Sequence, residues 1–302
     1  MKKRVITIVS AIVLSTTALT AGTGFPETDK ILAQDVKEDG QMEPQKLKEL
    51  LDKKVPLIIL DVRYEEERAE GTIPAENTLT IPREELEFNV GNQIRDKNAL
   101  IVSFCRSGPL GILVTHTLKQ LGYKNAISLK GGLKGWAKLG YPIRTPIGET
   151  VLFTESESVK VHKTVLKTKA DVNEITPIAL KDMTDKNENV IILDVRENEQ
   201  RSEGKIYVGE MYTDDTYAIT RGNLEFNISK KIDDKDALIV TYSSSGDRGK
   251  LAVETLRQLG YKNAVNLQGG LKAWAKTGYP IETGLGLTVL KESIDHDHNN
   301  IQ

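Results

Sequence analysis

The chain has 302 residues, a formal net charge of −2, 39% hydrophobic residues and 28% charged residues. This length is typical of two domains rather than one, and the composition is that of a globular protein able to bury real cores. The near-neutral, mixed charge gives no electrostatic reason to expect a nucleic-acid partner.

The first residues have the order of an export signal. Lys2, Lys3 and Arg4 precede an apolar run without charges over residues 5–21, and small residues follow it. We therefore expect a signal peptide over residues 1–24, a tether over residues 25–40, and a protein that is exported: periplasmic, extracellular or associated with the cell envelope. An uncleaved anchor is the alternative, because the run is near the short limit of a membrane span. We expect no other membrane contact, because no later apolar run is long enough to cross a bilayer.

Cysteine usage is informative because the chain contains a single cysteine, Cys105. Exported proteins commonly use cysteines in pairs for disulfides, which this chain cannot form internally. A free thiol in an oxidising compartment is open to oxidation. The presence of Cys105 therefore indicates either deep burial or a chemical task.

The chain contains one unit twice. Residues 118–143 recur at 256–281, an offset of 138, and residues 57–63 recur at 190–196, an offset of 133. The second unit therefore has five extra residues, which fall between Gly204 and Leu224. Repeats of this length are whole domains. The predicted boundaries are 41–147 for the first unit, 148–172 for a linker, 173–285 for the second unit and 286–302 for a tail.

Both units predict the same order of elements. In the first, we expect a helix over 44–53, a buried strand ending at 61–63, a short helical stretch over 64–70, a strand over 99–104, a helix over 111–121, a strand over 126–129 and a helix over 131–139. In the second, Thr176 and Pro177 are a good N-cap and first helical residue. Strands that alternate with helices predict an α/β fold, with a mostly parallel central sheet flanked by helices in each unit.

Cys105 follows a predicted buried strand directly and opens a short loop that leads into a helix. Ligands of parallel α/β sheets bind beyond the carboxyl ends of the strands. The loop amides, the dipole of the following helix and the charge of Arg106 all favour the thiolate over the thiol. A buried, inert cysteine is the alternative, but the loop and the helix favour a nucleophile.

The two repeats resemble rhodanese domains in tandem, of the thiosulfate sulfurtransferase-like kind. The residues that carry the resemblance are Asp61-Val62-Arg63, Gly71-Thr72-Ile73-Pro74-Ala75, Phe104-Cys105-Arg106-Ser107-Gly108 and Gly131-Gly132-Leu133 with Trp136. The resemblance implies a sulfurtransferase in which Cys105 takes a sulfane sulfur from an anionic donor such as thiosulfate, holds it as a persulfide, and passes it to cyanide or a thiol. Arg106, Ser107, Gly108 and Leu110 would bind the donor. No metal and no organic cofactor is implied.

Two departures from related patterns bear on this expectation. Phosphatases with a similar fold carry an arginine six residues after the cysteine, and this chain has Gly111 there, which disfavours phosphatase activity. Many rhodanese loops carry an arginine five residues after the cysteine, where this chain has Leu110, and Pro109 removes one amide from the loop. The identity of the donor therefore stays open.

The second unit has Ser243 at the position of Cys105. A serine nucleophile needs a nearby base, and the four histidines of the chain (His116, His162, His296 and His298) lie outside the folded part of this unit. We therefore expect the second unit to be inactive. The resemblance to two-domain rhodaneses implies that it contacts the first unit. The pairs Asp61–Arg63 and Asp194–Arg196 and the two tryptophans recur in both units, which favours a structural role for them. The tail histidines are expected to be solvated.

Two other functions remain open. The chain could be a non-catalytic carrier or sensor of sulfane sulfur or polysulfide that delivers sulfur from Cys105 to a partner protein. It could also be a pair of domains without chemistry, in which case replacing Cys105 would change nothing.

Overall fold

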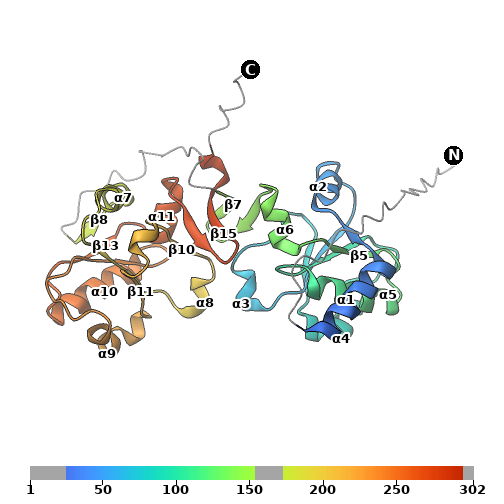
Figure 1. Ribbon diagram of the computed structural model, residues 1–302, viewed down its shortest axis with the longest axis horizontal. Coiled ribbons are helices and arrows are strands. Elements are labelled where there is room, and N and C mark those ends of the chain that lie inside the picture. Colours follow the sequence, from blue (N-terminus) through green and yellow to red (C-terminus); the bar gives the residue numbers. More distant parts are fainter. Residues whose placement is uncertain (1–24, 154–172, 295–302) are drawn as a thin grey trace, which may run out of the picture.

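The computed structural model describes residues 25–153 and 173–294. Within these ranges the chain forms two parallel α/β units joined by an antiparallel sheet (Figure 1), which confirms the fold class expected from the repeats. The first unit lies on the blue-to-green side of Figure 1 and the second on the yellow-to-red side. The predicted signal peptide over residues 1–24 lies outside the described residues, as do the three histidines at 162, 296 and 298.

The first unit is built on a five-stranded sheet of order β1-β5-β4-β2-β3, in which all neighbours are parallel. Its strands are β1 (Gln41–Met42), β2 (Ile58–Asp61), β3 (Thr78–Thr80), β4 (Ile101–Phe104) and β5 (Ala126–Leu129). Its helices are α2 (Pro44–Asp52), α3 (Glu65–Arg68), α4 (Leu86–Gln93), α5 (Pro109–Gln120) and α6 (Gly132–Lys138), with a 3₁₀ turn over Arg83–Glu85. The continuous apolar runs of β2 and β4 are explained because helices cover both faces of the sheet.

The two faces of this sheet bury separate cores. On the α2 and α6 face, Leu47 and Trp136 pack against alternate strand residues such as Val102 and Phe104. On the α4 and α5 face, the core contains Ile101 together with Cys105. Since successive strand residues point to opposite faces, Cys105 shares the α5 face with Ile101. Trp136 is 1% exposed, which confirms the expected core role.

The second unit repeats this arrangement, with strand order β8-β13-β12-β9-β11, again all parallel. Its strands are β8 (Glu174–Ile175), β9 (Ile191–Asp194), β11 (Thr216–Ala218), β12 (Ile239–Tyr242) and β13 (Ala264–Leu267). Its helices are α7 (Pro177–Asp185), α8 (Asn198–Arg201), α9 (Leu224–Asn227), α10 (Asp247–Gln258) and α11 (Gly270–Lys276). Short 3₁₀ turns cover Glu210–Tyr212, Arg221–Asn223 and Ile228–Lys230. The side chain of Thr176 accepts a hydrogen bond from the amide of Ala179, which confirms the expected N-cap.

An antiparallel sheet of order β10-β14-β15-β7-β6 connects the units. Its strands are β6 (Ile143–Thr145), β7 (Gly148–Leu152), β10 (Lys205–Ile206), β14 (Ile281–Thr283) and β15 (Gly286–Leu290). Strands β7 and β15 are equivalent in the repeat, and Val151 lies opposite its own counterpart Val289. The two units are therefore related by a local two-fold axis that passes through this pair of valines.

The hairpin turns of the two units are exchanged across this axis. Ile147, in the β6–β7 turn of the first unit, is buried in the core of the second unit beside Tyr279 and Ile281. Its counterpart Leu285, in the β14–β15 turn, packs on the core of the first unit that contains Ile143. Each unit therefore completes a core of the other, so the expected contact between them is a shared hydrophobic structure.

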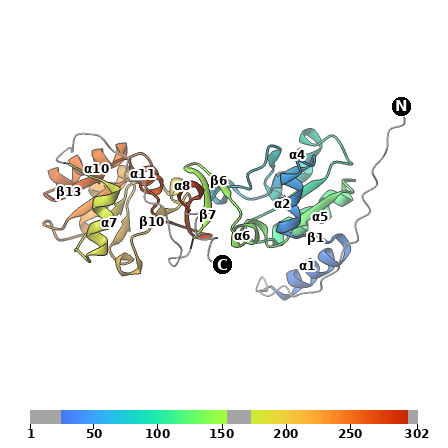
Figure 2. The same ribbon diagram turned by 90° about the horizontal axis from the view of Figure 1, so that it is seen from above.

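Three predicted boundary segments are structured, so those predictions were wrong in part. The expected tether contains helix α1 (Pro26–Asp39), which packs along α5 at the outer side of the first unit (Figure 2). Leu32 is fully buried there, and the carboxylate of Asp39 lies 3.1 Å from His116 and 3.2 Å from Lys119. The expected linker begins with β7, and the expected tail contains β15 and a 3₁₀ turn over Lys291–Ser293. The sequence did not indicate α1 because the helix is mostly polar and buries only Leu32 and Asp35.

The recurring Asp–Arg pairs are structural, as the sequence indicated. Arg63 is fully buried, and its guanidinium is 2.6 Å from the carboxylate of Asp61 and donates to the carbonyl of Gly71 at 2.7 Å. Arg196 and Asp194 form the same 2.6 Å pair in the second unit. Each arginine links the loop that follows the strand to the carboxyl end of that strand, in the cysteine-containing and the serine-containing unit alike.

Candidate active site

Cys105 lies immediately after the carboxyl end of β4 and is 3% exposed. The chain reverses over residues 106–108 and enters α5 at Pro109, whose fixed backbone suits the first turn of a helix. Gly108 has a φ of +118°, a conformation that side chains disfavour, and its amide donates a hydrogen bond to Cys105 Sγ at 3.1 Å. The loop therefore wraps back on the sulfur with one donor already aimed at it.

The amino end of α6 holds this loop from the other side. The amide of Leu133 donates to the carbonyl of Cys105 at 2.9 Å, and the amide of Lys134 donates to the carbonyl of Arg106 at 2.9 Å. Gly132 has a φ of +57°, and a Cβ added there would lie 2.2 Å from the Cys105 carbonyl oxygen. The Gly-Gly sequence at the start of α6 is thus required for the close approach of α6 to the loop that carries Cys105.

A buried hydroxyl sets the distance between β4 and α5. Ser103 Oγ donates to the carbonyl of Gly111 at 2.9 Å and lies 2.8 Å from the hydroxyl of Thr115. These contacts fix the first turn of α5 beside Cys105, so the amides at the start of the helix and its positive dipole end lie near the sulfur.

The remaining predicted donor-binding residues lie on the same loop. Ser107 is exposed, whereas Leu110 is partly buried and packs against the core on the α4 and α5 face. Gly108 is buried and contacts the sulfur through its amide. The structure thus brings the predicted site residues together around Cys105, while their roles in binding a donor stay predictions.

Arg106 has partners that the sequence did not reveal. Its Nε donates to Glu70 at 2.8 Å, its Nη2 lies 2.8 Å from the second carboxylate oxygen, and its Nη2 also donates to the carbonyl of Gly284 at 2.7 Å. The hydrogen bond that Arg106 donates to Glu70 raises the pKa of Arg106 above its ordinary value. The positive charge expected to face a donor is therefore paired with Glu70. In the sequence, Glu70 recurs as Glu203, but the second unit has Ser244 at the position of Arg106, so the recurrence did not indicate this ion pair. No local pattern indicated the contact with Gly284.

The loop of the second unit keeps the shape and changes the chemistry. Ser243 is 3% exposed, and the amide of Gly246 donates to its Oγ at 3.1 Å, as Gly108 does to Cys105. Asp247 begins α10 and accepts a hydrogen bond from Ser245 at 2.9 Å, so a carboxylate stands at the position that Pro109 has in the first unit. Arg248 donates to the side chain of Gln200. The described part of this unit contains no histidine to act as a base for Ser243.

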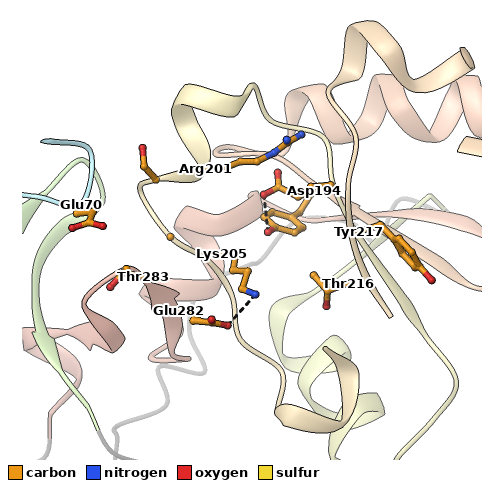
Figure 3. Close-up of a pocket in the computed structure, with 13 residues that line it drawn as sticks. Glu70, Asp194, Arg201, Lys205, Thr216, Tyr217, Glu282 and Thr283 are labelled. Carbon is orange, nitrogen blue, oxygen red and sulfur yellow. Dashed lines mark hydrogen bonds and ion pairs between the residues drawn. The ribbon is translucent and has the colours of Figure 1, made fainter. Parts of the chain in front are cut away.

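A cavity of about 500 Å³ lies beside the serine-containing unit (Figure 3). Its walls include Lys205, paired with Glu282 at 3.1 Å, and the hydroxyl of Tyr242, which donates to Asp194 at 2.9 Å. Cys105 is not among its lining residues, but Glu70 and Gly284, the partners of Arg106, are. The cavity therefore borders the contact between the units without including the sulfur.

The described residues also bear on two other functions, metal binding and membrane insertion. No group of three or more histidine, cysteine, aspartate or glutamate side chains is placed to hold a metal ion in residues 25–153 and 173–294. In the same ranges, no helix is both long and apolar enough to cross a membrane.

Both units are similar in sequence to a known family of domains. A model of the rhodanese-like domain matches residues 43–139 and again residues 176–277, which together cover most of the chain. The chain belongs to the rhodanese-like domain family. The two matches lie within the two parallel units, and α1 and the strands β7 and β15 lie outside them.

Relatives with curated names resemble one unit rather than the whole chain. A "Sulfurtransferase" of Allochromatium vinosum is 32% identical over 92 residues, which are 30% of this chain and 82% of that protein. A "Thiosulfate:glutathione sulfurtransferase" of Homo sapiens is 33% identical over 90 residues, 26% of this chain and 76% of that protein. Among solved structures, a thiosulfate sulfurtransferase from Pseudomonas aeruginosa aligns with 80% of this chain and 43% of its own length, at 18% identity and a TM-score of 0.33.

Proposed function

We propose that this rhodanese-like protein transfers sulfane sulfur through a persulfide on Cys105. The observation that carries the proposal is the Cys105 loop, in which the Gly108 amide donates to Sγ at 3.1 Å and helix α5 begins directly behind the sulfur. A hydrogen bond to sulfur and a helix amino end both favour the nucleophilic thiolate. The family membership and the sulfurtransferase names of relatives support the same chemistry.

The reaction we propose has two steps. The Cys105 thiolate attacks the sulfane sulfur of an anionic donor such as thiosulfate, a new S–S bond forms, and the donor's S–S bond breaks with its electron pair leaving on sulfite. The outer sulfur of the resulting persulfide carries the negative charge, and the loop amides at the start of α5 stabilise it. A thiophilic acceptor, cyanide or a thiolate, then attacks that outer sulfur and regenerates the Cys105 thiolate.

The serine-containing unit has a supporting role in this proposal. Ser243 occupies the same buried position as Cys105, but a serine without a base is not a nucleophile, and Asp247 disfavours an anionic donor at that loop. This unit instead contributes the turn that carries Leu285 to the core of the first unit. We also propose that the reaction takes place outside the cytoplasm, because residues 1–24 have the order of an export signal. Fractionation of cells that express the full chain or residues 25–302 tests this location.

The chemistry is tested with the purified protein and the Cys105→Ser variant, which makes the reactive loop begin as the second unit's loop does. We expect thiocyanate formation from thiosulfate or a thiosulfonate and cyanide, together with a mass increase of about 32 Da, one sulfur atom, on the wild type. Both should be absent in the variant. A sulfur adduct that no small acceptor removes would instead favour the carrier or sensor. The absence of an adduct with every sulfane-sulfur donor would refute sulfur transfer.

A further inference from the structure

The reactive loop over residues 105–110 contains one charged side chain, that of Arg106. Three hydrogen bonds and ion-pair contacts engage its Nε and Nη2: two to the carboxylate of Glu70 at 2.8 Å and one to the carbonyl of Gly284 at 2.7 Å. A carboxylate that contacts a guanidinium through both oxygens holds it in a fixed plane. Arg106 therefore has a set position and a paired charge before any donor arrives.

The pairing changes what the loop offers to an anion. Glu70 is 8% exposed and the side chain of Arg106 is 32% exposed, so water screens the contact between them only in part. Arg106 and Glu70 together carry no net charge, which leaves the loop amides and the α5 dipole as the attraction for a donor. These partial charges can stabilise one negative charge on a bound donor. A second negative charge on the donor would gain little from the paired Arg106 and would be repelled by Glu70.

The second unit supplies part of this arrangement. A Cβ added to Gly284 would lie 2.1 Å from Arg106 Nη2 and 2.1 Å from Glu70 Oε1, so the β14–β15 turn sits directly on the ion pair. In the second unit the position of Arg106 is Ser244, and the counterpart of Glu70, Glu203, lies 3.9 Å from Arg196. An arginine held by a glutamate and a turn carbonyl is thus a feature of the cysteine-containing unit.

We propose that Glu70 and the β14–β15 turn of the second unit tune the Cys105 site toward sulfane-sulfur donors with a single negative charge, such as thiosulfonates, and against dianionic thiosulfate. This inference rests on the proposed sulfur transfer through Cys105. Glu70 is a positioning residue, since it acts through Arg106. With a thiosulfonate the step is balanced as before: the Cys105–S bond to the sulfane sulfur forms, the donor's S–S bond breaks, and its electron pair leaves on a sulfinate.

The test compares methanethiosulfonate, a monoanion, with thiosulfate, a dianion, as donors to wild type and to Glu70→Gln. The measured quantity is the ratio of their kcat/KM values, in which differences in protein concentration cancel. Glutamine keeps the shape and an acceptor oxygen but removes the charge. We expect Glu70→Gln to shift the ratio toward thiosulfate by about tenfold, the order of magnitude for one partly screened charge beside the site. Glu203→Gln is the matched control and should leave the ratio unchanged.

A second variant tests the contribution of the turn. Gly284→Ala places a methyl group where Arg106 and Glu70 now lie, whereas Gly222→Ala, also in the second unit, meets open space. We expect Gly284→Ala to shift the ratio toward thiosulfate by more than about threefold because it separates the pair, and Gly222→Ala to have the wild-type ratio. A wild-type ratio in both Glu70→Gln and Gly284→Ala, with the Cys105 adduct intact, overturns the inference alone. The absence of any adduct in the wild type overturns the proposed function and this inference with it.

Discussion

The buried ion pair between Arg63 and Asp61, at the end of β2, should contribute strongly to the stability of the first unit. Arg63 is fully buried and 2.6 Å from Asp61, and it donates to the carbonyls of Gly71 at 2.7 Å and Glu67 at 3.0 Å. Arg63→Met removes all these side-chain contacts and leaves the carboxylate of Asp61, which is 2% exposed, without its charged partner, although the backbone amide of residue 63 still donates to it at 3.1 Å. Breaking a buried pair on one side costs about 3–5 kcal/mol, because the remaining charge stays desolvated. We expect a loss of that size in the free energy of unfolding of the first unit.

The two tryptophans give each unit its own fluorescence signal. Trp136 lies in the first unit and Trp274 in the second, so the fluorescence change of a Trp274→Phe protein in urea reports the surroundings of Trp136. In that background, Asp61→Asn combined with Arg63→Met should cost at least about 1 kcal/mol less than Arg63→Met, because no charge is left buried. A double variant as unstable as the single one would show that lost hydrogen bonds, and not the bare carboxylate, dominate. That result would refute the reasoning.

Three further predictions follow from individual contacts. Leu32→Ala should lower the stability of the first unit by about 2–4 kcal/mol, measured through Trp136, whereas an undocked α1 would give no change. Gly132→Ala should abolish sulfur transfer because its Cβ would collide with the Cys105 carbonyl, while Gly140→Ala, which has a similar φ of +71° but open space, should retain it; equal activity of the two would contradict this account of the loop. Burial and the neighbouring Asp194 raise the pKa of Tyr242, so protonated Tyr242 stabilises the folded second unit below about pH 10, and this stabilisation is lost as the pH rises further. The stability difference between wild type and Tyr242→Phe, followed through Trp274, should therefore narrow above about pH 10; a constant difference would contradict it.

The parts of the fold that depend on local pattern could be predicted from the sequence. The buried strands were visible as apolar runs, and the duplicated segments fixed the number of units. The position of Cys105 after β4 followed because a parallel sheet gathers its loops at one edge. The roles of the Asp61–Arg63 pair and of Trp136 followed from their recurrence in a copy that lacks the cysteine.

What could not be predicted depends on contacts between distant segments. Helix α1 is polar except for a few residues such as Leu32, so its docking on α5 has no strong periodic signal. Strands β7 and β15 are short, and each becomes a central strand only when it pairs with the other unit. The hydrogen bond from Arg106 to Gly284 joins positions 178 residues apart, and a backbone carbonyl has no sequence signature.

The two-fold relation between the units explains why a serine-containing copy remains part of the structure. Since Val151 pairs with Val289 and each hairpin turn enters the neighbouring core, neither unit can close its own hydrophobic surface alone. The loop after β12 carries a serine in place of the cysteine without disturbing the shared sheet or either exchanged turn. In the β14–β15 turn, by contrast, Gly284 must leave space for Arg106 and Glu70. The second unit therefore needs a glycine at position 284, where its β14–β15 turn contacts Arg106 and Glu70. It does not need a cysteine at position 243, in the loop that corresponds to the Cys105 loop.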